Sequence, residues 1–219
     1  MKNDYTHITV ILDRTGSMES IRDDTIGGFN AFLTGQQAEP GEATLTLVQF
    51  DSQDPYEVIH HFKPIAEVPA LTRQTFVPRA STPLLDALGR GINDLEQSLG
   101  QKAAEERPTR VVMVIITDGQ ENASHEFRKE QIEKMIRDKQ EKRDWQFVFL
   151  SADLAAIEEA LSSGVREASV MSFDKDARGT QAAWTSASAR VADYRAKRSQ
   201  DVSFTEEDRA QQTSEKRRK

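Results

Sequence analysis

The chain alternates between short apolar runs, rich in β-branched and aromatic residues, and longer segments in which apolar residues recur every three or four positions. The short runs cover residues 8–12, 44–50, 56–62, 111–116, 147–150 and 168–173. Runs of this length and composition are typical of strands, whereas the longer segments are typical of amphipathic helices. The pattern therefore predicts six strands, most of them separated by helices.

The clearest helical segment begins near Pro83 and continues to about residue 104. Its apolar residues, including Leu84 and Leu88, recur at helical spacing. Ser81 or Thr82 is the expected N-cap, and Pro83 is the expected first helical residue. Further helices are expected over residues 19–33, 125–143, 154–162 and 180–198.

Apolar strands that alternate with helices predict an α/β fold, with a doubly wound, mostly parallel six-stranded sheet and helices on both faces. The connection between the second and third strands is the exception, because it contains only a few residues, including Pro55. Such a short connection allows only an antiparallel hairpin. We therefore expect one antiparallel edge strand.

The 219 residues are enough for one sizeable α/β domain and are few for two. We expect this domain to span residues 1–198. Residues 199–219 are polar and almost without apolar side chains, so they are expected to form a flexible C-terminal tail.

Composition narrows the function classes. The formal net charge of −7 argues against nucleic acid as a partner, and the absence of cysteine excludes disulfides and thiolate metal sites. The apolar run before Asp13 is too short for the core of a signal peptide, and no run approaches the ~20 residues of a membrane helix. The expected location is cytoplasmic, with no membrane partner.

Two of the apolar runs end in a carboxylate. The first stops at Asp13 and the fourth is followed by Asp118. If these two strands are neighbours in the sheet, both acids lie at its carboxyl edge, where open α/β sheets bind ligands. Thr15 and Ser17 follow Asp13 at alternate positions, and an extended loop directs alternate side chains to the same side.

Asp13, Thr15, Ser17, Thr82 and Asp118 would together supply oxygen ligands alone, which suits Mg²⁺, with Mn²⁺ or Ca²⁺ as alternatives. Two carboxylates neutralise a divalent ion without saturating it. A neutral ion with an open coordination position accepts an acidic oxygen from outside. The expected function is therefore binding of a protein partner through its Asp or Glu side chain, without catalysis.

Three segments, ILDRTGSM, ASTPLLDAL and VVMVIITDGQEN, resemble the metal-ion-dependent adhesion site (MIDAS) of von Willebrand factor type A domains, whose pattern is DxSxS, a distant Thr and a distant Asp. The resemblance extends over about residues 5–198. It implies a Rossmann-like von Willebrand A fold in which Thr15 and Ser17 bind the metal directly. It also implies that Thr82 binds the metal in at least one state, and that Asp13 and Asp118 act directly or through water. Thr15 departs from the family, which usually has Ser there.

Other interpretations remain open at this point. ILDRTGSM also resembles the nucleophile loop of haloacid-dehalogenase-type phosphotransferases, which would make the protein a Mg²⁺-dependent phosphatase or phosphotransferase with Asp13 as nucleophile. Asp13, Thr15 and Ser17 are also common helix caps, and Asp118 precedes a glycine as turn-forming residues do. A third class is a structural protein with a degenerate site.

Two local features carry further expectations. Residues 120–122 follow Asp118, so they are expected to form a rim that contacts the partner. Gly27 and Gly28 lie inside a predicted helix, where each costs about 1 kcal/mol relative to alanine. Close packing of this helix against the sheet is the expected reason for both.

Overall fold

The computed structural model describes residues 4–213 and contains a six-stranded sheet in the order β3-β2-β1-β4-β5-β6. The strands are β1 (Tyr5–Asp13), β2 (Glu42–Asp51), β3 (Asp54–Pro64), β4 (Arg110–Thr117), β5 (Gln146–Ser151) and β6 (Val170–Ser172). Only the β2–β3 pair is antiparallel. The expected doubly wound sheet with one antiparallel edge strand is confirmed.

β1 and β4 are neighbours at the centre of the sheet. They pair in parallel from Thr6–Arg110 to Leu12–Ile116. Asp13, the last residue of β1, and Asp118, the residue after β4, therefore lie at the same edge. The order of the strands reverses between these two, since β2 and β3 lie on one side and β5 and β6 on the other. This is the switch point at which α/β sheets bind ligands.

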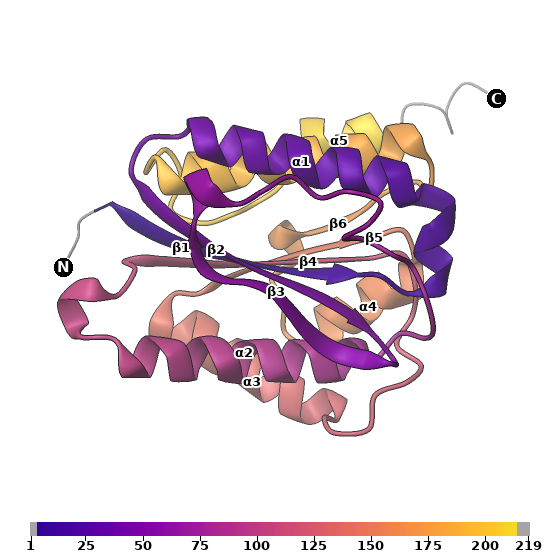
Figure 1. Cartoon of the computed structure of the whole chain (residues 1–219), viewed down its shortest axis with the longest axis horizontal. Coiled ribbons are helices and arrows are strands. Elements are labelled where there is room, and N and C mark those ends of the chain that lie inside the picture. Colours follow the sequence, from indigo (N-terminus) through magenta and orange to yellow (C-terminus); the bar gives the residue numbers. More distant parts are fainter. Residues whose placement is uncertain (1–3, 214–219) are drawn as a thin grey trace.

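Helices cover both faces of the sheet (Figure 1). One layer contains α1 (Arg22–Ala38) and α5 (Ala177–Arg195), and the other contains α2 (Leu84–Gln101), α3 (Lys129–Arg143) and α4 (Leu154–Ser162). Alternate residues of each central strand enter the two cores: Ile8 and Val10 pack on the α1 side and Ile11 on the α2 side. The continuous apolar strands are therefore explained by burial on both faces.

Helix boundaries differ from the predicted ones by a few residues. The first predicted helix divides into a 3₁₀ helix, η1 (Gly16–Ile21), and α1. Helix α2 begins at Leu84, and Pro83 takes the N-cap position without a side-chain cap. The expected capping role of Ser81 or Thr82 is therefore wrong, and the cap of α2 comes from a distant loop described below.

The two glycines of α1 have different surroundings. A Cβ atom on Gly28 would lie 2.0 Å from Cδ1 of Trp184, whereas a Cβ on Gly27 would meet nothing within 4 Å. Gly28 thus permits close packing of α1 on α5, and not on the sheet as expected. Gly27 has no packing reason in the fold.

The segment after residue 198 packs on the domain. Val202 and Phe204 join the α1-side core, and the backbone of Phe204 donates to the carbonyl of Ala168. Helix α6 (Glu206–Thr213) follows and contacts α5. The expectation of a loose polar tail is wrong for residues 199–213, because two apolar side chains anchor them. The last part of that tail, residues 214–219, lies outside the described residues.

Within residues 4–213, every helix is too short or too polar to cross a membrane.

Candidate metal site

The loop after β1 brings Asp13, Thr15 and Ser17 together. Asp13 is the last residue of β1 and has no exposed surface. The Thr15 amide donates to Asp13 Oδ1 at 2.6 Å, and the Thr15 and Ser17 hydroxyls lie 3.2 Å apart. Thr15 is the N-cap of η1, yet its side chain makes no capping hydrogen bond. The hydroxyls therefore point to one another and not to a helix end.

Asp118 joins this group from β4. The Ser17 hydroxyl donates to Asp118 Oδ1 at 2.5 Å, although the two residues are 101 positions apart. Asp118 is 6% exposed and Ser17 is exposed, so the carboxylate lies just beneath the surface. The predicted meeting of the two strand ends is realised by a direct hydrogen bond.

Thr82 completes the set through the backbone of Gly119. A Cβ atom on Gly119 would lie 3.5 Å from Ser17 Oγ and 3.6 Å from Thr82 Oγ1. Both hydroxyls therefore approach one point above Gly119. All five residues expected at the site come from three separate loops and lie at the same edge of the sheet.

Asp13 has an unusual electrostatic environment. Burial raises the pKa of Asp13 to about 7, and the nearby charge of Asp118 adds to this rise. Hydrogen bonds from Thr117 and Thr15 act in the opposite direction, but burial outweighs them. Thr117 Oγ1 donates to Asp13 Oδ2 at 2.5 Å. Both oxygens of Asp13 thus have internal donors. Thr117 was missed in the sequence because it reads as one more buried strand residue.

A lysine also reaches this group. Lys175, in the connection between β6 and α5, places Nζ 2.6 Å from Asp118 Oδ2. This oxygen is buried and has no hydrogen-bond partner among the described residues, so its contact with Lys175 is a charge contact. An oxygen that lacks a directed donor and attracts a cation fits a metal ligand.

The chemistry of the donor set agrees with a hard divalent ion. Within the part of the chain that the structure describes, no three His, Cys, Asp or Glu side chains form a metal-holding group. A metal at this edge would therefore be held by Asp13 and Asp118 with the hydroxyls of Thr15, Ser17 and Thr82. Such all-oxygen sites suit Mg²⁺ or Mn²⁺.

The loop after Asp118 is fastened to the head of α2. Glu121 accepts from the Leu85 amide at 2.9 Å and so caps the helix, while Asn122 Oδ1 accepts from the Thr82 amide at 2.9 Å. Asp86 in turn accepts from the amides of residues 125–127. The side chains of residues 121 and 122 thus bind the protein's own backbone. The expectation that residues 120–122 form a partner-contacting rim stays a prediction.

A third strand also ends in a carboxylate. Asp51, the last residue of β2, is fully buried and binds Arg14 Nε at 2.6 Å and Arg79 Nε at 2.9 Å. Burial acts to raise the pKa of Asp51, but hydrogen bonds from Arg14, Arg79 and two backbone amides outweigh it and lower the pKa. Asp51 therefore ties the loops of Thr15 and Thr82 together. The rule that identified Asp13 and Asp118 also identifies this position.

No protein-family model and no curated protein sequence matches the chain. Its fold matches solved structures at low sequence identity. Proximal thread matrix protein 1 from the mussel byssus aligns with a TM-score of 0.58 and 15% identity over 86% of this chain, which spans 45% of the mussel protein. Another structure of that mussel protein, described with a zinc-occupied MIDAS motif, aligns with a TM-score of 0.51 and 16% identity. This alignment covers 77% of this chain and 41% of the mussel chain.

Two further neighbours have the same fold. Manganese-loaded TRAP protein from Plasmodium vivax aligns with a TM-score of 0.55 and 13% identity over 86% of this chain and 72% of its own. A von Willebrand factor type A protein from Catenulispora acidiphila aligns with a TM-score of 0.56 and 10% identity, over 86% of this chain and 43% of the Catenulispora chain. The strand order, the two helical layers and these neighbours show that the chain has the von Willebrand factor type A fold.

Proposed function

We propose that the protein is a metal-dependent binding module that holds Mg²⁺ between Asp13, Thr15, Ser17, Thr82 and Asp118. The observation that carries this proposal is the convergence of these five oxygen-bearing side chains from three loops, linked by the Ser17–Asp118 hydrogen bond. One structural neighbour is described with a zinc-occupied MIDAS motif and another as manganese-loaded, and both descriptions support a divalent ion in this proposal.

The ion would be completed by a carboxylate of a protein partner. Two acids bring a divalent cation to neutrality, and neutral hydroxyls leave it electrophilic, so an external Asp or Glu is the complementary ligand. The partner's acid would approach from the solvent side of Ser17, which is exposed. We include a cytoplasmic location in this proposal.

Binding is favoured over phosphoryl transfer by the state of Asp13. A nucleophilic carboxylate needs a free oxygen facing the substrate. Asp13 is without exposed surface, and its two oxygens accept from Thr117 and Thr15. Lys175, the lysine near the site, contacts Asp118 and not Asp13.

The test is to titrate the protein with Mg²⁺ by calorimetry and with Mn²⁺ by NMR. We expect saturable binding, with paramagnetic broadening centred on residues 13–17, 82 and 118. Asp118→Asn should abolish it, whereas Asp138→Asn, an exposed carboxylate on α3, should not. Absence of metal binding by the unmutated chain, or metal-dependent hydrolysis of acetyl phosphate that Asp13→Asn removes, would overturn the proposal.

The partner is then sought in a lysate of the source organism, with Mg²⁺ or with EDTA. We expect a protein retained in Mg²⁺ that is lost both in EDTA and with Asp118→Asn. A protein retained under all conditions would not be the acid-bearing partner proposed.

A further inference from the structure

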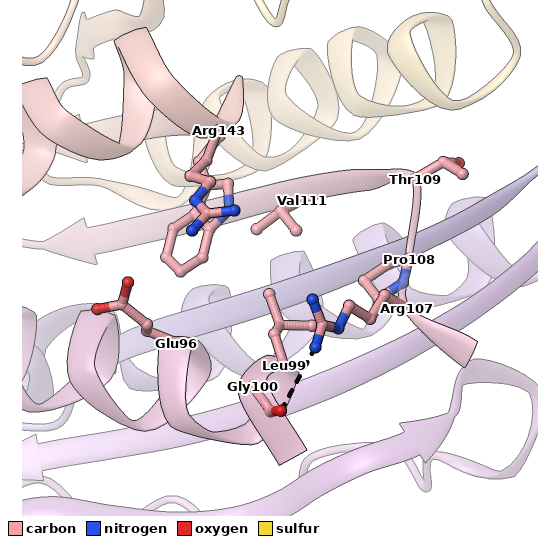
Figure 2. Close-up of a pocket in the computed structure, with 9 residues that line it drawn as sticks. Glu96, Leu99, Gly100, Arg107, Pro108, Thr109, Val111 and Arg143 are labelled. Atoms are coloured by element: carbon pink, nitrogen blue, oxygen red, sulfur yellow. Dashed lines mark hydrogen bonds between the residues drawn. The ribbon is translucent and has the colours of Figure 1, made fainter. Parts of the chain in front are cut away.

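A hollow lies at the opposite edge of the sheet from the candidate metal site, where the strands begin (Figure 2). Its volume is about 380 Å³. It is bounded by the end of α2, the 107–109 connection, the start of β4 and the junction of α3 with β5. We call this hollow the amino-edge pocket. Its size falls within the 300–1,000 Å³ that is usual for small-molecule sites.

The lining of the amino-edge pocket is apolar in its depth. Val111 is 5% exposed and Trp145 is 4% exposed, and both belong to the core on the α2 side. Leu99 packs partly buried against the same core. These side chains form a surface on which a flat apolar group can pack.

The rim of the amino-edge pocket is basic. Figure 2 shows Arg107 and Arg143 reaching it from different elements. Arg107 donates Nε to the Lys102 carbonyl at 3.0 Å, which fixes its guanidinium at the end of α2. Arg143 is exposed, and its guanidinium forms no hydrogen bond or ion pair with any described residue.

The acid at the rim, Glu96, is already neutralised. Its carboxylate forms an ion pair with Lys139, whose ammonium also lies 5.5 Å from the centroid of the Trp145 ring. The charges of Glu96 and Lys139 cancel, so Arg107 and Arg143 give the pocket rim a local charge of about +2. The whole protein carries −7, so a preference of this pocket for an anion must come from its own side chains and not from the net charge.

We propose that the amino-edge pocket binds a small carboxylic acid with a flat apolar body. The planar guanidinium of Arg143 matches a carboxylate in a two-bond geometry, and Arg107 adds a second positive charge. The apolar body packs on Trp145, Leu99 and Val111. This site is independent of the metal site, since the two lie at opposite ends of β4.

The test uses 2-naphthoate as the probe and its neutral amide, 2-naphthamide, as the matched control ligand. Binding is followed by backbone amide shifts in EDTA, which removes any contribution of the metal site. We expect saturable shifts for naphthoate at residues 99–100, 107–111 and 143–145. Naphthamide should bind at least about ten-fold more weakly, the loss of one charge-assisted pair.

Two variants test the two halves of the proposal. Arg143→Gln removes the free guanidinium and should weaken naphthoate binding about ten-fold. Arg137→Gln, on the same helix but outside the pocket, should leave naphthoate binding unchanged. A Cβ atom on Gly100 would meet no described atom within 4 Å, and Gly100 lines the pocket, so Gly100→Leu should fold normally and extend its side chain into the pocket.

The proposal is overturned by three results. These are the absence of saturable naphthoate binding in the millimolar range, equal binding of naphthoate and naphthamide, and naphthoate binding that Arg143→Gln leaves unchanged. Loss of binding in both Arg143→Gln and Gly100→Leu, with Arg137→Gln unaffected, supports it. None of these results depends on whether the metal site functions as proposed.

Discussion

Lys175 Nζ lies 2.6 Å from Asp118 Oδ2, on the carboxylate that is expected to share a divalent ion with Asp13. The Asp118 side chain has no exposed surface, whereas that of Lys175 is 37% exposed. The ammonium therefore supplies positive charge next to this buried carboxylate. A metal that takes Asp118 Oδ2 as a ligand must displace it.

Replacing Lys175 with methionine should have opposite effects on metal affinity and on stability. Mg²⁺ affinity should rise about three- to five-fold, because the ion no longer competes with a partly exposed ion pair worth up to about 1 kcal/mol. In EDTA, the melting temperature should fall, because Asp118 loses its counter-charge. Calorimetry and thermal unfolding measure the two effects.

Lys175→Arg is the control for this change and should behave as the unmutated protein in EDTA. A Lys175→Met protein that binds Mg²⁺ more weakly would contradict the competition, since it would mean that Lys175 supports the metal-binding state.

Gly119→Ala should weaken metal binding without unfolding the protein. The new methyl would sit 3.5 Å from Ser17 Oγ and 3.6 Å from Thr82 Oγ1, which are ordinary contact distances. It would nevertheless stand between two expected ligands, so we expect Mg²⁺ affinity to fall at least about ten-fold, or about 1.4 kcal/mol. Calorimetry, with thermal unfolding in EDTA as the folding control, checks this. Unchanged affinity would place the metal elsewhere.

Gly28→Ala and Gly27→Ala form a matched pair on α1. The Gly28 substitution forces a methyl into Trp184 and should lower the free energy of unfolding by about 1–3 kcal/mol, the usual range for overpacking. The Gly27 substitution meets open space and should raise it by up to about 1 kcal/mol through helix propensity. Urea unfolding of both variants decides the matter, and equal effects would refute the packing of α1 on α5.

His7 should make stability depend on pH in the acid range. It is fully buried on β1, stacks on Phe62 and contacts Thr44 Oγ1 at 2.8 Å. Burial, with smaller contributions from the charges of His61 and Lys102, lowers its pKa to about 3.

The unfolded chain therefore binds a proton at His7 below about pH 6.5 while the folded protein does not, so stability falls as pH falls from 6.5 towards 3. Between pH 7 and pH 5 the loss from this residue is about 2 kcal/mol. Urea unfolding at both values should show a smaller difference for His7→Gln than for the unmutated protein. His125→Gln, at an exposed position, is the control and should keep the full pH dependence of stability. If His7→Gln also keeps it, the buried neutral imidazole of His7 is not the source of the pH dependence.

Much of the fold follows from the sequence because its strands are continuous apolar runs, which only a doubly covered parallel sheet can bury. The same logic located Asp13 and Asp118, since the carboxyl ends of adjacent parallel strands must meet. Thr82 was expected from its place at the head of the predicted helix that begins near Pro83, and the resemblance to a known motif supported it. Its hydroxyl and that of Ser17 lie 3.6 Å and 3.5 Å from the position that a Cβ atom on Gly119 would take, which places both next to the residue after Asp118.

Lys175 could not be found in this way. It stands in the connection after a three-residue strand and has no motif around it, so only the pairing of β5 with β6 brings it to Asp118. Val202 and Phe204 were also missed, because two apolar residues among polar ones give no periodic signal. Their burial depends on contacts with distant parts of the chain, since both join the core on the α1 side and the Phe204 amide donates to the Ala168 carbonyl.

The hydrogen bonds between the Asp118 loop and the head of α2 have a mechanical consequence. Asn122 and Thr82 exchange two hydrogen bonds, and Glu121 and Asp86 hold further amides across the same junction. Two of the five expected ligands, Thr82 and Asp118, are therefore fastened to the head of a helix of 18 residues. Tension applied through a bound carboxylate would pass along that helix into the body of the domain, instead of peeling away a single loop.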